Sequence, residues 1–148
     1  MAYDHHDKAG NQGDVVKHVA LIAALDTIVA AQPGRKFSYA DVFAGHPWHH
    51  LLTGNEWKSG IGKLHRNSGL NGNPHIGLWS KWYLDGRPDL LYGMYPGSSV
   101  IAWDVCRYRN IPVRLSLWDI SPDVIRDLMV VFGDGKHSIH GRPAVADE

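Results

Sequence analysis

The sequence contains one cysteine, no long apolar run and no net charge. Cys106 is the only cysteine among 148 residues, which excludes an intramolecular disulfide and a cysteine-rich zinc site. No apolar run approaches the roughly 20 residues that a helix needs to span a bilayer, and the polar N-terminus lacks the apolar core of a signal peptide. We therefore expect a cytoplasmic protein that makes no contact with a membrane.

The charged side chains balance, because 15 Lys and Arg stand against 15 Asp and Glu. Such a chain has no global positive field that would gather nucleic acid, so any RNA contact must come from a local patch. The ten histidines would strengthen such a patch as the pH falls toward their ordinary pKa of about 6.5. Apolar residues make up 44% of the chain, enough for one globular core.

The spacing of apolar residues predicts a helix and then a strand in the first third of the chain. Asn11 can cap the helix, which should end near Ala31 because a Pro-Gly pair follows. The segment Lys36–Val42 (KFSYADV) is predicted to form a buried strand. This strand runs into Phe43-Ala44-Gly45, a turn whose small residues would let backbone approach a ligand closely.

Regular spacing returns near residue 95. The predicted elements there are a helix capped by Ser98, the strand Val113–Trp118, a helix capped by Ser121 and ended by a left-handed Gly133, and the strand His137–His140. Between the two regular regions, residues 46–94 are rich in glycine and tryptophan. We expect an inserted helical subdomain there, with short helices at Glu56–Leu64 and Leu78–Leu84.

Strands that alternate with helices predict a parallel sheet with right-handed crossovers, so residues 1–148 should form the first half of a doubly wound α/β domain. Ligands of such folds bind at the carboxyl ends of the strands. Asp41 and Asp119 lie at two of these ends. An acid there can accept hydrogen bonds from both hydroxyls of a ribose, although Asp41 could equally satisfy a loop and Asp119 a helix start. The glycine pattern of a plain dinucleotide-binding fold is absent.

Lys17 and His18 lie in the first two turns of the first helix. Cations there interact unfavourably with the helix dipole, at a cost of about 0.3 kcal/mol. An anionic partner, either a carboxylate or an RNA phosphate, would offset this cost. The alternative is that Lys17 is an ordinary solvated side chain.

Three groups of residues carry a resemblance to a known family. They are Tyr3, His5, Ala9-Gly10-Asn11, Asp14-Val15 and Lys17-His18; then Tyr95-Pro96-Gly97-Ser98 with Ile101-Ala102; and then Asp119 with Pro122. The first group resembles the opening Y-x-H-x-x-x-A-G-N-x-x-D-V-x-K-H of the RlmJ family of bacterial adenine-N6 methyltransferases, which act on large-subunit ribosomal RNA. The second resembles that family's Y-P-G-S-P-x-I-A, and the third its E-L-H-P.

The resemblance implies a Rossmann-like class I methyltransferase fold, S-adenosylmethionine as cofactor and ribosomal RNA as partner. It assigns roles residue by residue. The residues implied at the cofactor are His18, Gly45, Ser98 and Asp119, of which Asp119 would hold the ribose hydroxyls. The residues implied at the RNA are Tyr3, His5 and Lys17.

The sequence also departs from the family. Phe43 replaces a histidine that would touch the cofactor, and Pro47 replaces a glycine of the same turn. The catalytic D-P-P-Y motif is absent, and Asn73-Pro74-His75 is a poor substitute because it has one proline and no aromatic residue. We therefore expect a truncated member of the fold that is inactive alone. A completing polypeptide or a second copy of the chain would supply the rest.

Two alternatives remain open. The chain could be a non-catalytic remnant of the fold that binds RNA or protein through Tyr3, Lys17 and the tryptophan-bearing insert. It could also hold a metal at His5-His6-Asp7 or at His49-His50. Adjacent histidines do not share a helix face, and neither pair has a partner four residues away, so we expect no metal site.

Overall fold

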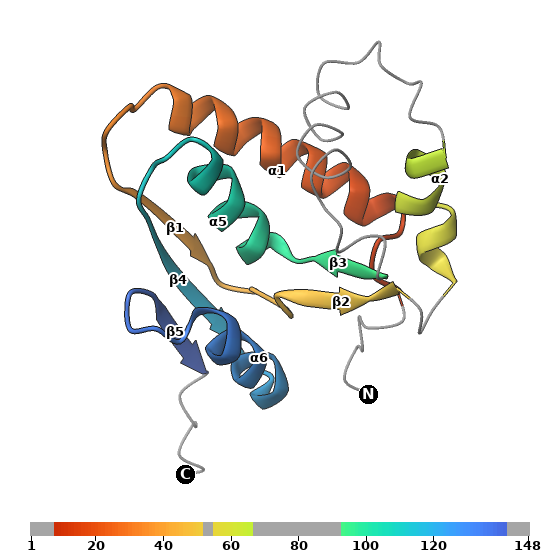
Figure 1. Ribbon diagram of the computed structural model, residues 1–148. Helices are drawn as coiled ribbons and strands as arrows, with labels where there is room; N and C mark the ends of the chain where they lie inside the picture. The colour runs from red at the N-terminus through yellow and green to blue at the C-terminus, as the bar shows by residue number, and fades with distance from the viewer. Residues whose placement is uncertain (1–7, 52–54, 67–92, 142–148) are drawn as a thin grey trace.

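The computed structural model describes residues 8–51, 55–66 and 93–141 of the chain. Its elements are, in order, α1 (Gln12–Ala30), β1 (Phe37–Asp41), β2 (Trp48–His50), η3 (Glu56–Lys58), α2 (Ile61–Arg66), β3 (Met94–Pro96), α5 (Ser98–Tyr108), β4 (Val113–Asp119), α6 (Pro122–Phe132) and β5 (Ser138–Gly141) (Figure 1). The predicted alternation of strands and helices is therefore present. The predicted helix Leu78–Leu84 lies outside the described residues.

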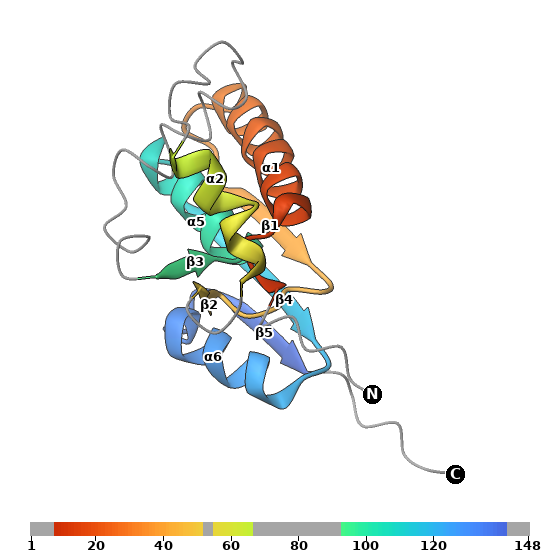
Figure 2. The ribbon, with the colours of Figure 1, turned by 90° about the vertical axis from the view of Figure 1, so that its right-hand side faces the viewer.

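The main sheet has the strand order β1-β4-β5, and both neighbouring pairs are parallel. Phe37 aligns with Val113, and Ser116 aligns with Ser138. The two crossovers, through α5 and then α6, step across the sheet in the same direction. Because right-handed crossovers that step the same way place their helices on the same face, α5 and α6 cover one side of the sheet. Figure 2 shows both helices on that side.

The core forms where α5 and α6 meet the sheet. Leu115 and Leu117 alternate along β4 and are fully buried against the helices, as are Ile101 of α5 and Leu128 of α6. The long helix α1 packs on α5 and so forms an outer layer. No helix among residues 8–51, 55–66 and 93–141 is long and apolar enough to cross a membrane.

The predicted helix starts at Asn11 and Ser121 are confirmed. The Asn11 side chain accepts a hydrogen bond from the Asp14 amide at 3.0 Å, and Ser121 accepts one from the Val124 amide at 3.5 Å. The prediction that Ser98 caps α5 is wrong. Gly97 is the cap, with no side-chain bond, and Ser98 is the first helical residue, because its hydroxyl is bonded to a strand end instead.

The prediction of a left-handed Gly133 is also wrong, since its φ is −77°. The residue lacks room rather than needing a special conformation: a Cβ on Gly133 would lie 2.2 Å from the carbonyl oxygen of Met129. The predicted helix Glu56–Leu64 is divided in two at Gly60. A Cβ on Gly60 would lie 2.1 Å from the carbonyl oxygen of Gly10, so this close approach to the start of α1 interrupts the helix.

The strands β2 and β3 form a second, antiparallel sheet that the sequence did not predict. Trp48 aligns with Pro96, and His50 aligns with Met94. This small sheet brings the segment after β1 against the segment before α5. It therefore holds the carboxyl end of β1 close to the start of α5.

Candidate cofactor-binding site

The candidate site lies where the carboxyl ends of β1 and β4 meet the first turn of α5. Asp41 ends β1, Asp119 ends β4, and Ser98 begins α5. In open α/β sheets this edge is where ligands bind. The predicted placement of both acids at strand ends is thus confirmed.

Asp41 is the centre of the first cluster. Its Oδ2 accepts hydrogen bonds from the Ser98 hydroxyl at 2.6 Å and the Tyr39 hydroxyl at 3.0 Å, and its Oδ1 accepts one from the Phe43 amide at 3.1 Å. The carboxylate therefore fixes the start of α5 to the end of β1. A negative charge at the first turn of a helix is also favoured by the helix dipole.

Tyr39 lies two residues before Asp41, so both side chains leave the strand on the same face. Burial of the phenol raises the pKa of Tyr39 well above its ordinary value, and the nearby charge of Asp41 raises it further. Tyr39 is therefore a neutral hydrogen-bond donor at every physiological pH. It helps to orient the carboxylate and cannot serve as a base.

Asp119 is the centre of the second cluster. Its Oδ2 accepts a hydrogen bond from the Gly45 amide at 3.0 Å, and its Oδ1 accepts one from the Ser121 amide at 2.9 Å. The Ala44 amide donates to the carbonyl oxygen of Trp118 at 3.0 Å, which adds a backbone link between the same two segments. The loop after β1 is therefore held against the end of β4.

Two glycines shape this loop for different reasons. Gly45 has a φ of +63°, a conformation that side chains disfavour, and the space where a Cβ would lie is open. Gly97 has an ordinary φ, but a Cβ on it would lie 2.2 Å from the carbonyl oxygen of His46. The Gly97 amide donates to the Pro47 carbonyl at 2.8 Å, so the loop crosses directly over the start of α5.

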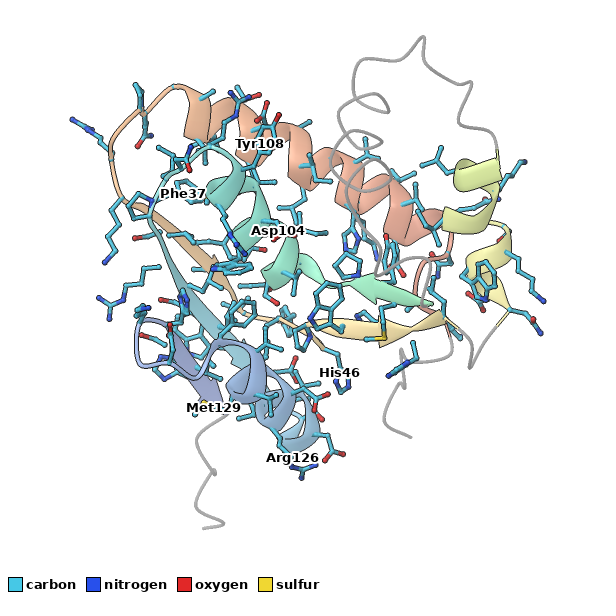
Figure 3. The ribbon with its side chains drawn as sticks, viewed as in Figure 1. Phe37, His46, Asp104, Tyr108, Arg126 and Met129 are labelled. Carbon is cyan, nitrogen blue, oxygen red and sulfur yellow. The ribbon has the colours of Figure 1, made fainter. Side chains whose placement is uncertain are left out.

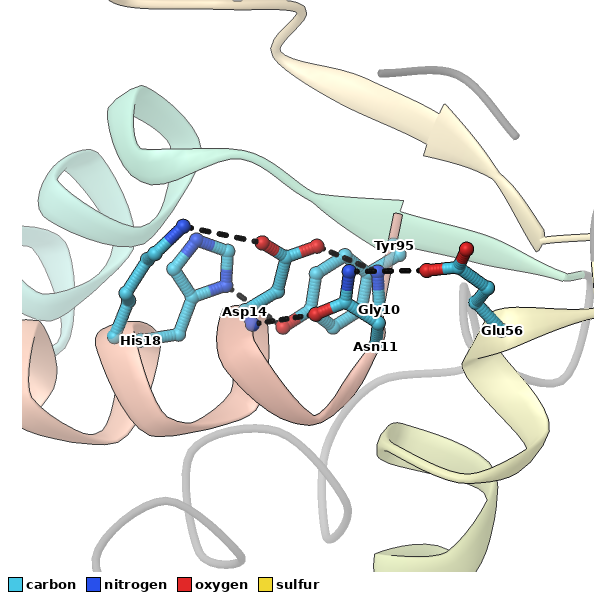
Figure 4. Close-up of polar contacts among 7 residues, drawn as sticks. Gly10, Asn11, Asp14, His18, Glu56 and Tyr95 are labelled. Atoms are coloured by element: carbon cyan, nitrogen blue, oxygen red, sulfur yellow. Dashed lines mark hydrogen bonds and ion pairs between the residues drawn. The ribbon is translucent and has the colours of Figure 1, made fainter. Parts of the chain in front are cut away.

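The third cluster joins α1 to β3 (Figure 4). His18 Nδ1 lies 2.7 Å from the hydroxyl of Tyr95, and the two rings stack with centroids 5.3 Å apart. Asp14 accepts a hydrogen bond from the Gly10 amide at 3.0 Å. Burial raises the pKa of Tyr95, and the charge of Asp14 raises it further. The neutral phenol of Tyr95 thus positions the His18 ring. Tyr95 itself lies three residues before Ser98 in the sequence.

Lys17 has a carboxylate partner one turn away in its own helix. Its Nζ lies 3.8 Å from Asp14 Oδ1, and its own side chain is 73% exposed. An ion pair this exposed contributes little, at most about 1 kcal/mol. Asp14 nevertheless supplies the anionic neighbour that offsets a cation near the start of α1, and the Lys17 side chain extends into solvent.

A histidine pair lines the same loop. His46 lies next to α6, where its Nδ1 is 2.7 Å from Asp127 Oδ2 (Figure 3). The ring of His49 meets the ring of His46 edge-on, with centroids 6.0 Å apart. His49 is buried and His50 is exposed on opposite faces of β2, which does not suit a shared metal. The parts of the chain that the structure describes hold no group of three metal-ligating side chains.

The structure brings together three of the four residues that the resemblance implies at the cofactor. Gly45 and Asp119 bond directly, and Ser98 Oγ lies 3.4 Å from the Ala44 carbonyl in the same loop. Tyr3, His5, His6, Asp7 and the string Asn73-Pro74-His75 lie outside the described residues. Tyr39 was not predicted at the site, and Tyr95 was named only as part of a motif, without a role. The two-residue spacing of Tyr39 and Asp41 on a strand was the signal that could have found the first.

The arrangement is suited to binding rather than to bond making. Each oxygen of Asp119 accepts one amide, and a carboxylate offers about four acceptor positions, so two remain for the hydroxyls of a sugar. Asp41 places a second carboxylate beside the start of α5, which suits a cationic ligand more than a phosphate. The 84% exposed ring of Phe43 offers a flat apolar surface next to it.

Comparison with known proteins found no family model that matches the chain. Ribosomal RNA large subunit methyltransferase J from Haemophilus influenzae is 28% identical over 144 residues, which cover 93% of this chain and 48% of that protein. The crystal structure of protein LPL1258 from Legionella pneumophila, of the family DUF519, has a TM-score of 0.62 at 22% identity, covering 88% of this chain and 48% of that one. The chain thus has the predicted Rossmann-like fold, is similar to a ribosomal RNA methyltransferase, and spans about half the length of these relatives.

Proposed function

We propose that this chain is the cofactor-binding half of a methyltransferase that uses S-adenosylmethionine to modify adenine N6 in large-subunit ribosomal RNA. The observation that carries the proposal is the Asp119 carboxylate, which the amides of Gly45 and Ser121 hold at the end of β4. Similarity to ribosomal RNA large subunit methyltransferase J supports the reaction class.

The described residues fit this cofactor. Asp119 would accept the ribose hydroxyls, and the open space above Gly45 would admit the nucleoside. S-adenosylmethionine carries a sulfonium cation, which a carboxylate such as Asp41 favours. Ser98 and His18 would lie at the methionine portion, and Tyr95 holds the His18 ring in place. Tyr3, His5 and Lys17 would contact the RNA in the cytoplasm.

Methyl transfer would require residues that this chain does not carry. Adenine-N6 chemistry needs an acceptor for the exocyclic amine and an aromatic ring that stacks on the extruded base. The sequence has no D-P-P-Y motif that would supply them. We therefore propose that these residues bind the cofactor, and that transfer to RNA would need a further segment, in the same or another polypeptide, that carries such a motif.

Calorimetry with S-adenosylhomocysteine tests the proposal. Asp119→Ala removes the hydrogen bonds of a charged group, which contribute about 1.5–3 kcal/mol, so the affinity should fall roughly 10- to 100-fold. Asp123→Ala is the matched control, because the Asp123 side chain is 72% exposed and its carboxylate pairs with Arg126 of the same helix at 2.9 Å. Its affinity should equal that of the unmodified chain.

Three outcomes separate the proposal from its alternatives. Binding that Asp119→Ala weakens and Asp123→Ala preserves supports a nucleoside site. No heat at high ligand concentration, with both variants folded, contradicts it. A salt-dependent gel shift with a ribosomal RNA hairpin, in a chain that binds no S-adenosylhomocysteine, would instead support the non-catalytic RNA-binding remnant.

A further inference from the structure

A groove lies at the end of the main sheet opposite the candidate cofactor site. Its volume is about 430 Å³, and it is bounded by the last turn of α5, the start of β4 and the loops that precede β4 and β5 (Figure 1). Cavities that hold small molecules have volumes of roughly 300–1,000 Å³. Asp119 ends β4 at the cofactor site and Val113 begins β4 at the groove, so the seven residues of the strand separate the two by about 20 Å. We call this cavity the amino-end groove.

Positive charge gathers around the amino-end groove, although the chain as a whole has no net charge. Three segments meet there; they are residues 35–36, 107–114 and 134–137. Together they contain six of the 15 Lys and Arg residues and one of the 15 Asp and Glu residues. That acid, Asp134, lies 3.2 Å from Lys136, and Arg109 pairs with Asp26 of α1 at 2.6 Å. The other four cations have no acidic partner among the described residues, so an anion that enters the groove meets uncompensated positive charge.

Arg107 is held in place by an aromatic ring of its own helix. Its guanidinium carbon lies 5.0 Å from the centroid of the half-buried Trp103 ring, which is a cation–π contact. The Trp103 ring in turn meets the ring of Phe132 in α6 edge-on, with centroids 6.3 Å apart. A guanidinium that rests on a fixed ring loses little conformational freedom on binding, and its planar fork matches two oxygens of a phosphate.

His137 contributes a hydrogen-bond donor to the amino-end groove. Its Nδ1 accepts a hydrogen bond from the Leu115 amide at 3.1 Å, so the proton of the neutral ring is on Nε2. Burial lowers the pKa of His137, the charge of Asp134 opposes this shift, and the charges of Lys136 and Lys36 add to it. The ring is therefore a neutral donor near neutral pH, and Lys36 lies close enough to act on it.

These groups together suit a phosphate. Apart from Asp134, the polar side chains that line the groove can all donate hydrogen bonds; they are Arg107, Asn110, Lys136 and His137. Ile111, Pro112 and Val113 add an apolar wall, which suits the sugar or base attached to a phosphate better than a bare ion.

We infer that the amino-end groove binds the phosphate group of a nucleotide, either a unit of an RNA backbone or a free nucleotide. The inference goes beyond the proposed function, because none of the residues that line the groove is assigned to the cofactor or to the RNA. It rests on the contacts of Arg107 and His137 and on the local charge, so its test does not depend on the cofactor.

A nuclear magnetic resonance titration of the isotope-labelled chain tests the inference. The probes are inorganic phosphate, uridine monophosphate and a short oligouridylate, which lack the adenosine that the proposed cofactor site would bind. The signals followed are the Arg107 Nε–H group and the Leu115 amide at the groove, with the Gly45 amide as a reference at the other end of the sheet. We expect the two groove signals to move with each probe and the Gly45 signal to stay, relative to sodium chloride at the same ionic strength.

Two arginines provide a matched pair of variants. Arg107→Ala removes a charged, two-pronged donor and should weaken uridine monophosphate binding at least tenfold. Arg126 of α6 is 71% exposed, pairs with Asp123 at 2.9 Å and does not line the groove, so Arg126→Ala should bind like the unmodified chain. Asp119→Ala should also leave this binding unchanged, which separates failure of the groove from failure of the cofactor site. Melting temperatures show whether each variant remains folded.

The oligouridylate distinguishes the two sources of the phosphate. An RNA backbone is the ligand if the oligouridylate binds more tightly than uridine monophosphate, with an affinity that falls as salt rises and a logarithmic salt slope that Arg107→Ala reduces by about 0.7. A free nucleotide is the ligand if the oligouridylate binds no more tightly than uridine monophosphate. The inference is overturned if no probe moves the Arg107 and Leu115 signals, or if Arg126→Ala weakens binding as much as Arg107→Ala.

Discussion

The hydrogen bond between Ser98 and Asp41 gives the sharpest test of the site geometry. Ser98 Oγ donates to Asp41 Oδ2 at 2.6 Å, and this bond joins the first turn of α5 to the end of β1. Three chains with alanine at Ser98, at Asp41 and at both positions complete a double-mutant cycle. The cycle isolates the energy of this one contact.

The structure sets the expected magnitudes. A hydrogen bond to a charged group contributes about 1.5–3 kcal/mol, which is the loss expected for Ser98→Ala. Asp41→Ala removes the acceptor of three donors, including the half-buried Tyr39 hydroxyl, so the loss should be about 3–5 kcal/mol. The double variant should be little worse than Asp41→Ala, which gives a coupling energy of about 1.5–3 kcal/mol. The melting temperature of Asp41→Ala should fall by about 10 °C.

Urea unfolding followed by circular dichroism measures all four corners of the cycle. Ser38→Ala provides a control serine, since Ser38 is exposed on the face of β1 opposite Asp41. Combined with Asp41→Ala, it should show additive losses. If the Ser98 and Asp41 losses also add to within about 0.5 kcal/mol, the two side chains are not coupled. That result would refute the account of how α5 is held to β1.

Two further predictions concern the loop and the pH dependence of stability. Gly97→Ala places a Cβ 2.2 Å from the His46 carbonyl oxygen, so the melting temperature should fall by an amount equivalent to about 1–3 kcal/mol, and S-adenosylhomocysteine should bind more weakly in calorimetry. Gly141→Ala, which meets open space, should change neither, and equal effects at both positions would contradict the prediction. His137 Nδ1 accepts a hydrogen bond from the Leu115 amide at 3.1 Å, and burial lowers the His137 pKa below its ordinary value, although the nearby charge of Asp134 opposes part of this shift. The unfolded chain then binds more protons between the lowered pKa and about 6.5, so stability should be present above that window and be lost as the pH falls through it. Melting temperatures from pH 8 to 5 should fall less steeply in His137→Asn, which keeps an acceptor but does not titrate; an unchanged slope would exclude His137 as the cause.

Much of the fold could be predicted because it depends on local patterns. Asn11 and Ser121 cap their helices as expected, and the predicted strand Lys36–Val42 differs from β1 by one residue at each end. The sheet β2–β3 could not be predicted in this way. Its strands are three residues long and lie more than 40 residues apart in the sequence. Such short strands show no clear alternation of apolar and polar residues, and their pairing depends on contacts between distant segments.

The candidate site shows the same division. The acids at the strand ends follow from the order of strands and helices, which is why Asp119 could be placed beside the Gly45 loop from sequence patterns and family resemblance. The role of Ser98 could not be predicted, because its hydroxyl can either cap a helix or donate a hydrogen bond to Asp41. Which bond forms depends on how α5 packs against β1, and the residues next to Ser98 in the sequence do not determine that packing.

Among the described strands, β1 lies at the end of its sheet and pairs with β4 alone, which has a consequence for the behaviour of the chain at high concentration. Unpaired strand edges invite association with other chains, and apolar surface left uncovered binds chaperones and proteases. A chain whose β1 edge stays unpaired is therefore expected to associate with other copies as its concentration rises.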